Sequence, residues 1–426
     1  MHYPRILLAL AALSLASPVV AEDFQGSTHA LKYDDPPIEY SKQTPQDRIA
    51  KLQAQIVSGE VKLKWDDEYG WLPALLDELK IPKSSQMLVF SQTSLQRREI
   101  NPRNPRAIFY NDDVYVGYIP HAPMMEISAV DPKLGGIFYS LDQVPQDKPS
   151  FTRNQDCIQC HVSPRSLGIP GHFVRSLRTD GGGEIIAGTD TSEVTHCTPL
   201  ADRWGGWYVT GQSGAQTHLG NLVGLSAFDR HSGDPSYRGN VPDLREIIDT
   251  SKYLTPHSDI VALMVLEHQV HMHNYITRLN YETRTMTETY GHIRYLKNQV
   301  NAFLRYLLFT EETPLSGPVS GDPQYVADFT APGPRDSKGR SLRDLDLQTR
   351  TFKYPCSFLI YSEAFDQIPM VMRDHLLQRL YDILTGKDED PEFSKITAND
   401  RQAVLEILRE TKPNLPAYWQ PLAAKQ

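Results

Sequence analysis

Two cysteines and a histidine stand at a spacing that supports several kinds of chemistry, because residues 157–161 read Cys-Ile-Gln-Cys-His. Two thiols at this spacing can form a reversible dithiol–disulfide pair, which is expected where a buried strand leads into a helix. They can also supply half of a zinc site, which needs two further ligands at matching spacing. With a histidine directly after them, they can attach a haem covalently.

The surrounding sequence favours haem over the other two uses. Residues 151–156 do not have the pattern of a buried parallel strand, and the chain contains no second Cys-x-x-Cys. We therefore expect Cys157 and Cys160 each to form a thioether with one vinyl group of the porphyrin. His161 then lies under the iron as an axial ligand.

This Cys-x-x-Cys-His motif resembles that of the c-type cytochromes. Over most of its length the chain is also similar to a group of uncharacterised exported bacterial haem c proteins. These share a segment like residues 203–209, Arg-Trp-Gly-Gly-Trp-Tyr-Val, downstream of one such motif. The resemblance implies one covalent haem c and export from the cytoplasm, but it implies no reaction. The compact small cytochrome c domain is a poor match, because a helix should precede the motif and this chain has strand-like patterns there.

The N-terminus has the features of a secretory signal peptide over residues 1–21. A short basic start is followed by about ten apolar residues and then by small residues that suit cleavage before Glu22. No later apolar stretch is long enough to span a bilayer. We expect a periplasmic protein without a membrane span, and this compartment agrees with covalent haem attachment.

The net charge of the chain indicates which kinds of partner it can bind. The chain has 43 Lys and Arg against 52 Asp and Glu, a formal net charge of −9. A negative protein is not suited to binding nucleic acid or anionic membranes. It suits a basic redox partner protein in the periplasm, and the sequence leaves the oligomeric state open.

Two of the four cysteines lie outside the motif, Cys197 and Cys356. In an oxidising compartment such a pair is a candidate disulfide. Two separate buried thiols are the alternative, and spacing does not decide between them.

The patterns predict an α+β fold, with a small antiparallel sheet in the N-terminal half, a Gly-rich haem-binding segment and a mostly helical C-terminal half. Alternating residues predict strands over 86–90, 107–110, 114–118, 125–130 and 136–140, and residues 111–113 read as a hairpin turn. Helical spacing predicts helices over 46–57, 72–79, 260–279, 293–309, 369–385 and 397–411, the third capped by Ser258. The regions are a polar N-terminal arm (22–45), an α/β platform (46–150), a haem c attachment segment (151–235) and a helical region (236–426).

The second axial ligand of the iron decides the function. A Met or His there makes an electron carrier, whereas an open position can bind or activate a small molecule. His268 is the candidate distal ligand, because residues 264–273 are rich in Met and His; a core histidine is the alternative. His172 and His218 are further candidates. His268 and His271 with Glu267 adjacent could instead bind zinc or copper.

We therefore expect electron transfer through one covalent haem c. The alternative is a haem-dependent oxidase or peroxidase with an open distal position, and the sequence does not decide whether the protein is an enzyme. Arg203 in the tryptophan segment (residues 203–209) is a candidate partner for a haem propionate. A buried aromatic cluster is the other interpretation of that segment.

Overall fold

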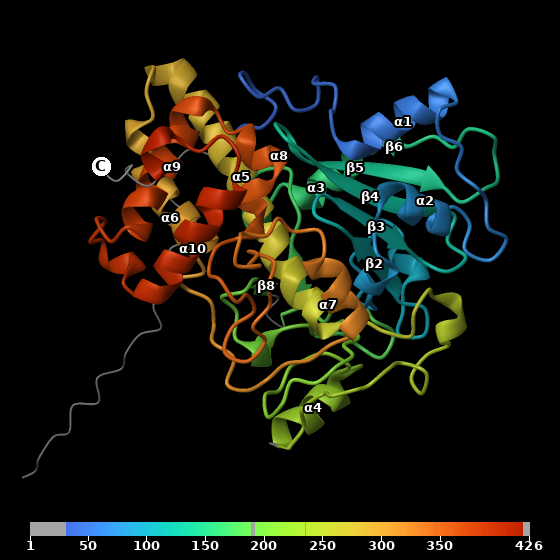
Figure 1. Cartoon of the computed structure of the whole chain (residues 1–426). Helices are drawn as coiled ribbons and strands as arrows, with labels where there is room; N and C mark the ends of the chain where they lie inside the picture. Colours follow the sequence, from blue (N-terminus) through green and yellow to red (C-terminus); the bar gives the residue numbers. More distant parts are fainter. Residues whose placement is uncertain (1–30, 189–191, 235, 421–426) are drawn as a thin grey trace, which may run out of the picture.

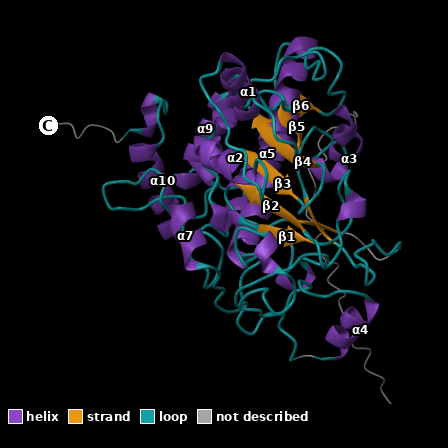
Figure 2. Cartoon of the chain, turned by 90° about the vertical axis from the view of Figure 1, so that its right-hand side faces the viewer, coloured by secondary structure: helices purple, strands orange, loops and turns teal. Residues whose placement is uncertain are grey.

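The computed structural model describes residues 31–188, 192–234 and 236–420. The predicted signal peptide lies outside these residues. The described chain forms the predicted α+β fold, with an antiparallel sheet of six strands in neighbour order β1 to β6. Figure 2 shows the strands inside the molecule with helices around them. The strands are β1 (Met87–Val89), β2 (Arg106–Tyr110), β3 (Val114–Tyr118), β4 (Met124–Asp131), β5 (Gly135–Asp142) and β6 (Thr152–Arg153).

The sheet follows the alternation in the sequence closely. The predicted turn between β2 and β3 is confirmed: the Asn111 N–H donates to the Val114 carbonyl at 3.1 Å, and the Asn111 side chain accepts from the Val114 N–H at 3.0 Å. An Asn that bonds the backbone ahead of it favours a tight turn. The six predicted helices are also present, and most of their ends lie within a few residues of the predicted ones. The predicted end at residue 279 is wrong, because that helix continues to Tyr290.

The α-helices are α1 (Arg48–Ser58), α2 (Leu72–Leu79), α3 (Ile158–His161), α4 (Leu225–Gly233), α5 (Ile260–Tyr290), α6 (Lys297–Leu307), α7 (Pro323–Thr330), α8 (Glu363–Asp366), α9 (Met370–Leu384) and α10 (Ala398–Thr411). The short helices α3, α4, α7 and α8 were not predicted. A further two-stranded sheet, β7 (Val174–Ser176) with β8 (Ser192–Val194), lies in the segment after the motif.

Helices cover both faces of the six-stranded sheet (Figure 1). The apolar residues of α1 and α2 pack in one core with one face of the sheet, which includes Phe109 and Ile127. The opposite face contributes Val89 and Tyr115 to a larger core with α5. Alternate strand residues therefore enter different cores, as the period of two requires.

Helix α5 is the central element of the C-terminal half. Its side chains are buried without interruption from Ile260 to Thr283, so no face of this stretch meets solvent. A helix buried on all sides belongs to a core rather than to a surface. It contacts α6, α7 and α8 as well as β5 and β7, and it therefore joins the helical half to the sheet.

The predicted cap of α5 is wrong by one residue. Asp259 is the N-cap, and its carboxylate accepts a hydrogen bond from the Ala262 N–H at 2.8 Å. The Ser258 hydroxyl instead accepts from the Leu88 N–H and donates to the Tyr208 carbonyl, at 2.8 and 2.6 Å. Ser258 thus links β1 to the tryptophan segment, which sequence pattern cannot reveal.

The described part of the predicted N-terminal arm is packed against the sheet. Ile38 and Tyr40 are buried in the same core as α1, and the Tyr40 hydroxyl donates to the Gly136 carbonyl at 2.8 Å. This segment is therefore not simply a polar surface arm. Among the described helices, none combines the length and apolar character that crossing a bilayer requires.

Candidate functional site

The Cys-x-x-Cys-His motif occupies a single helical turn directly after edge strand β6. Cys157 has helical backbone angles, and Ile158 to His161 form α3 (Figure 1). Positions three apart in a helix lie on the same side. The turn therefore presents Cys157 and Cys160 in a common direction, as attachment to one flat ligand requires.

The imidazole of His161 is held by a carbonyl ten residues further along the chain. Its Nδ1 lies 2.8 Å from the Gly171 carbonyl oxygen. Since a carbonyl only accepts, Nδ1 carries the proton, and Nε2 keeps its lone pair. Within the described chain Nε2 forms no hydrogen bond, so it is the nitrogen available to a metal. Metal-ligating histidines are commonly oriented by a hydrogen bond of this kind.

Aromatic rings surround His161. The Phe138 ring lies 4.4 Å and the Phe173 ring 5.2 Å from the imidazole, measured between centroids. Burial lowers the pKa of His161, while the Gly171 carbonyl acts in the opposite direction. The neutral imidazole is therefore favoured, and this is the form that ligates iron.

The two thiols differ in environment. Cys160 is exposed and Cys157 is half-buried. Burial, with the charges of Glu126 and Asp156, raises the pKa of Cys157 to about 11. Reactive redox dithiols have a lowered pKa, so this environment does not favour the dithiol alternative.

Gly171 allows the chain to approach α5 closely. A Cβ atom at this position would lie 2.2 Å from the Asn274 side-chain oxygen and 2.9 Å from Ile169. The adjacent His172 N–H donates to that oxygen at 3.1 Å. The Gly-rich segment is thus fixed against α5, and it places the Gly171 carbonyl at His161.

Charged side chains lie near the motif on two sides. Arg106 and Glu126, on β2 and β4, form a half-buried ion pair of 2.9 Å whose charges act on His161. Arg175 interacts electrostatically with both Arg165 and Cys160. Arg175 would be a candidate partner for a haem propionate, whereas Arg106 already has Glu126 as its partner.

The residues present therefore fit covalent haem. Cys157 and Cys160 would supply the thioether sulfurs, and His161 would offer an oriented nitrogen to the iron. Two observations support this fit: Cys157 and Cys160 lie on the same side of the helical turn, and the Gly171 carbonyl accepts a hydrogen bond from His161 Nδ1.

His268 lies in a different environment from the motif. Its Nδ1 is 2.8 Å from His196 Nδ1, and its Nε2 is 2.8 Å from the Ser357 hydroxyl. The ring is fully buried among Tyr306, Phe309 and Phe352. Burial holds its pKa well below the usual range, so it is neutral. With both nitrogens hydrogen-bonded, His268 has no nitrogen free for iron in this arrangement.

Of the other candidates, only His172 contacts His161. The two ring centroids are 6.2 Å apart, but His172 Nε2 is 2.8 Å from the Ser128 hydroxyl. His218 is buried in edge contact with Trp204, and its Nδ1 accepts from the Gly220 N–H at 3.0 Å. The structure thus brings His172 to the motif and keeps His218 and His268 in other contacts.

The zinc or copper alternative at His268 and His271 gains no support. No group of three or more His, Cys, Asp or Glu with metal-binding geometry occurs among residues 31–188, 192–234 and 236–420. His271 lies 2.7 Å from Glu193, whereas His268 bonds His196 and Ser357. The two histidines therefore have separate partners.

Arg203 is buried in a structural ion pair. Its guanidinium bonds the carboxylate of Glu267 on α5, and its Nε donates to the Thr198 carbonyl at 2.8 Å. The indole N–H of Trp204 donates to the same carboxylate at 3.2 Å. Since both charged side chains are almost fully buried, the tryptophan segment is a buried aromatic cluster on α5. A propionate would have to displace Glu267 from Arg203.

Cys197 and Cys356 are free thiols in the structure, so they form no disulfide. Cys356 is buried in the helical core and Cys197 packs against that core. Burial raises the pKa of both thiols, that of Cys197 to about 12. Both are protonated and unreactive at neutral pH.

None of the family models, curated proteins or solved structures searched matches this chain. The resemblance to c-type cytochromes therefore stays an expectation based on residues 157–161 and 203–209.

Sequence patterns did not reveal the residues that orient His161. The Gly171 carbonyl and the rings of Phe138 and Phe173 come from separate segments of the chain. The signal that could have indicated Gly171 is the pair of glycines at 168 and 171 just after the motif, because a glycine permits close backbone approach.

Proposed function

We propose that this protein is an exported c-type haem protein that transfers single electrons through one covalent haem. Cys157 and Cys160 attach the haem, and His161 is its axial ligand. The bound haem supplies a one-electron redox centre. The observation that carries the proposal is the hydrogen bond from His161 Nδ1 to the Gly171 carbonyl, which leaves Nε2 for iron.

The chain's own residues would then hold the haem in a fixed orientation. The helical turn positions the two sulfurs, while Gly171 fixes the histidine ring and raises its basicity. Arg175 supplies positive charge near Cys160, and Arg165 lies close enough to Arg175 to repel it. The net charge of −9 suits a basic redox partner protein in the periplasm.

The second candidate is a haem-dependent oxidase or peroxidase with an open distal position. The hydrogen bonds that occupy both nitrogens of His268 favour it, because they remove the distal ligand that the sequence suggested.

The absorption spectrum of the purified ferrous protein, with and without carbon monoxide, separates the two. The carrier predicts a low-spin spectrum that carbon monoxide leaves unchanged. Rapid carbon monoxide binding would contradict the simple carrier and support the open position.

The substitution His268→Ala tests directly whether His268 is the distal ligand, and the exposed His375→Ala is the matched control. Because His268 is engaged elsewhere, we expect neither substitution to change the spin state.

A further inference from the structure

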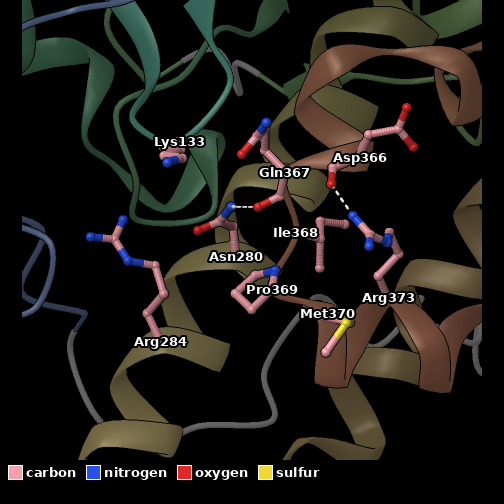
Figure 3. A pocket seen from close by; sticks show the side chains of 9 residues that line it. All are labelled: Lys133, Asn280, Arg284, Asp366, Gln367, Ile368, Pro369, Met370 and Arg373. Carbon is pink, nitrogen blue, oxygen red and sulfur yellow. Dashed lines mark hydrogen bonds between the residues drawn. The ribbon is translucent and has the colours of Figure 1, made fainter.

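A cavity of about 410 Å³ lies between the sheet platform and the helical half, away from the haem motif. It is formed by the turn between β4 and β5, by α5, and by the connection from α8 to α9 (Figure 3). Ligand sites often occupy such junctions between two packed units.

The lining of this cavity is strongly cationic for an acidic protein. Lys133, Arg284 and Arg373 come from three different elements that line the cavity. In Figure 3, Arg284 and Arg373 lie on opposite sides of Asn280 and Pro369, and the Arg373 guanidinium donates to the Asp366 backbone carbonyl. The negative side chain in the lining is Asp366, whose carboxylate is already paired with Lys412 at 2.6 Å. The cavity therefore carries an excess of positive charge, in contrast to the net charge of −9 for the whole chain.

The first turn of α9 adds further donors. This helix has 15 residues and begins at Met370, and its N-cap, Pro369, offers no side chain to its first N–H groups. Both residues line the cavity. The uncapped N–H groups and the positive end of the helix dipole favour an anion here.

Two polar atoms in the lining are buried without a partner among the described residues. One is Nη1 of Arg284, whose Nη2 donates to the Pro37 carbonyl at 2.5 Å. The other is Oδ1 of Asn280, a side chain that is only 2% exposed. Asn280 Nδ2 donates to the Gln367 carbonyl at 3.0 Å, which fixes the orientation of the amide. In Figure 3, Asn280 Oδ1 points to the side where Arg284 and Lys133 lie.

We propose that this cavity binds a tetrahedral oxyanion that keeps one hydroxyl, as hydrogen phosphate does. Lys133, Arg284, Arg373 and the N–H groups of α9 donate to its oxygens. The hydroxyl donates to Asn280 Oδ1, an acceptor that a fully deprotonated anion would leave unpaired. The volume also admits a small substituent, so the source is free phosphate or a phosphate monoester, such as glycerol phosphate, whose substituent carries the hydroxyl. The site does not depend on the haem or on the proposed electron transfer.

Titration calorimetry of the purified full-length protein in phosphate-free buffer tests the site, with inorganic phosphate as the probe. We expect saturable binding that weakens about tenfold or more in Lys133→Ala and in Arg373→Ala, because each loses a charge-assisted hydrogen bond. Lys133 is exposed, so its substitution does not endanger folding. Arg98→Ala, an exposed arginine outside the cavity, is the control for total charge and should bind as the wild type does.

Sulfate as a second probe tests whether the hydroxyl of the anion contributes to binding. Sulfate lacks a proton at neutral pH, so we expect it to bind at least tenfold more weakly than phosphate, and Asn280→Ala to abolish this preference. Glycerol phosphate is a further probe in the same experiment. If it binds more tightly than phosphate, the natural ligand is a monoester; if it binds more weakly, the natural ligand is free phosphate. The absence of saturable phosphate binding would overturn the proposal. The proposal would also be overturned if sulfate and phosphate bound with equal affinity. It would likewise be overturned if Arg98→Ala weakened phosphate binding as much as Lys133→Ala and Arg373→Ala do.

Discussion

At the residue scale, the neighbours of His161 orient its ring and leave Nε2 without a hydrogen bond among the described residues. Its Nδ1 is held by Gly171, its ring packs against Phe138, and burial keeps it neutral. His268 shows the opposite situation, since its two nitrogens bond His196 and Ser357. We therefore base the proposed ligation on the partners of a histidine's two nitrogens rather than on its position in a helix.

Arg203 provides a test at the same scale. Because Glu267 is fully buried, Arg203→Ala leaves a buried carboxylate without its partner. We expect a loss of about 3–5 kcal/mol in the free energy of unfolding, with no change in the haem spectrum of the folded fraction. Urea denaturation together with visible absorption measures both. The exposed Arg98→Ala should change stability by less than about 0.5 kcal/mol. A shifted haem spectrum with unchanged stability would instead favour a propionate contact.

At the element scale, α5 connects the two halves of the molecule, and its start is fixed by Asp259. One carboxylate oxygen accepts from the Ala262 N–H at 2.8 Å and the other from the Asp322 N–H at 2.5 Å. Burial raises the pKa of Asp259 to about 7. A single side chain thus holds the N-terminus of α5 and the segment that precedes α7.

We expect Asp259→Ala to lower the free energy of unfolding by about 2 kcal/mol, since it removes a cap and a second backbone contact. Asp259→Asn keeps an oxygen acceptor and should cost clearly less. Thermal and urea unfolding of the two variants give the comparison. Equal losses in both variants would show that the hydrogen bonds of this side chain do not stabilise α5.

At the scale of the whole molecule, several buried neutral histidines make the fold sensitive to acid. Burial lowers the pKa of both His218 and His273 to about 4, below the ordinary value of 6.5. Between these pH values the unfolded chain binds more protons than the folded chain. Their contribution to stability is therefore lost as the pH falls from 6.5 towards 4. Burial raises the pKa of Asp259 to about 7 and that of Glu267 to about 8. These carboxyl groups therefore act in the opposite direction, Asp259 over this whole range and Glu267 down to its ordinary value of 4.5.

The histidine contribution can be isolated by substitution. We expect wild-type stability to fall relative to His218→Gln by about 1 kcal/mol per pH unit as the pH decreases from 6.5 to 5. Urea denaturation of both proteins at several pH values measures this difference. A difference that does not vary with pH would contradict a buried, neutral His218.

The parts of the fold with a regular local pattern could be predicted from the sequence. The bounds of α2 and the turn between β2 and β3 follow from spacing and turn chemistry alone. The end of α5 and the cap at Asp259 could not, because tertiary contacts set them. In the candidate site the motif itself was evident, whereas the Gly171 hydrogen bond depends on the path of an irregular Gly-rich segment.

The most direct test of the central claim is mass spectrometry of the protein produced in a host that matures c-type haem proteins. Trypsin should release residues 154–165, which contain Cys157, Cys160 and His161. We predict that this peptide carries one haem bound through both sulfurs, and that Cys157→Ala leaves a single thioether while Cys197→Ala changes nothing. Recovery of the peptide with two free thiols and no haem would contradict the account.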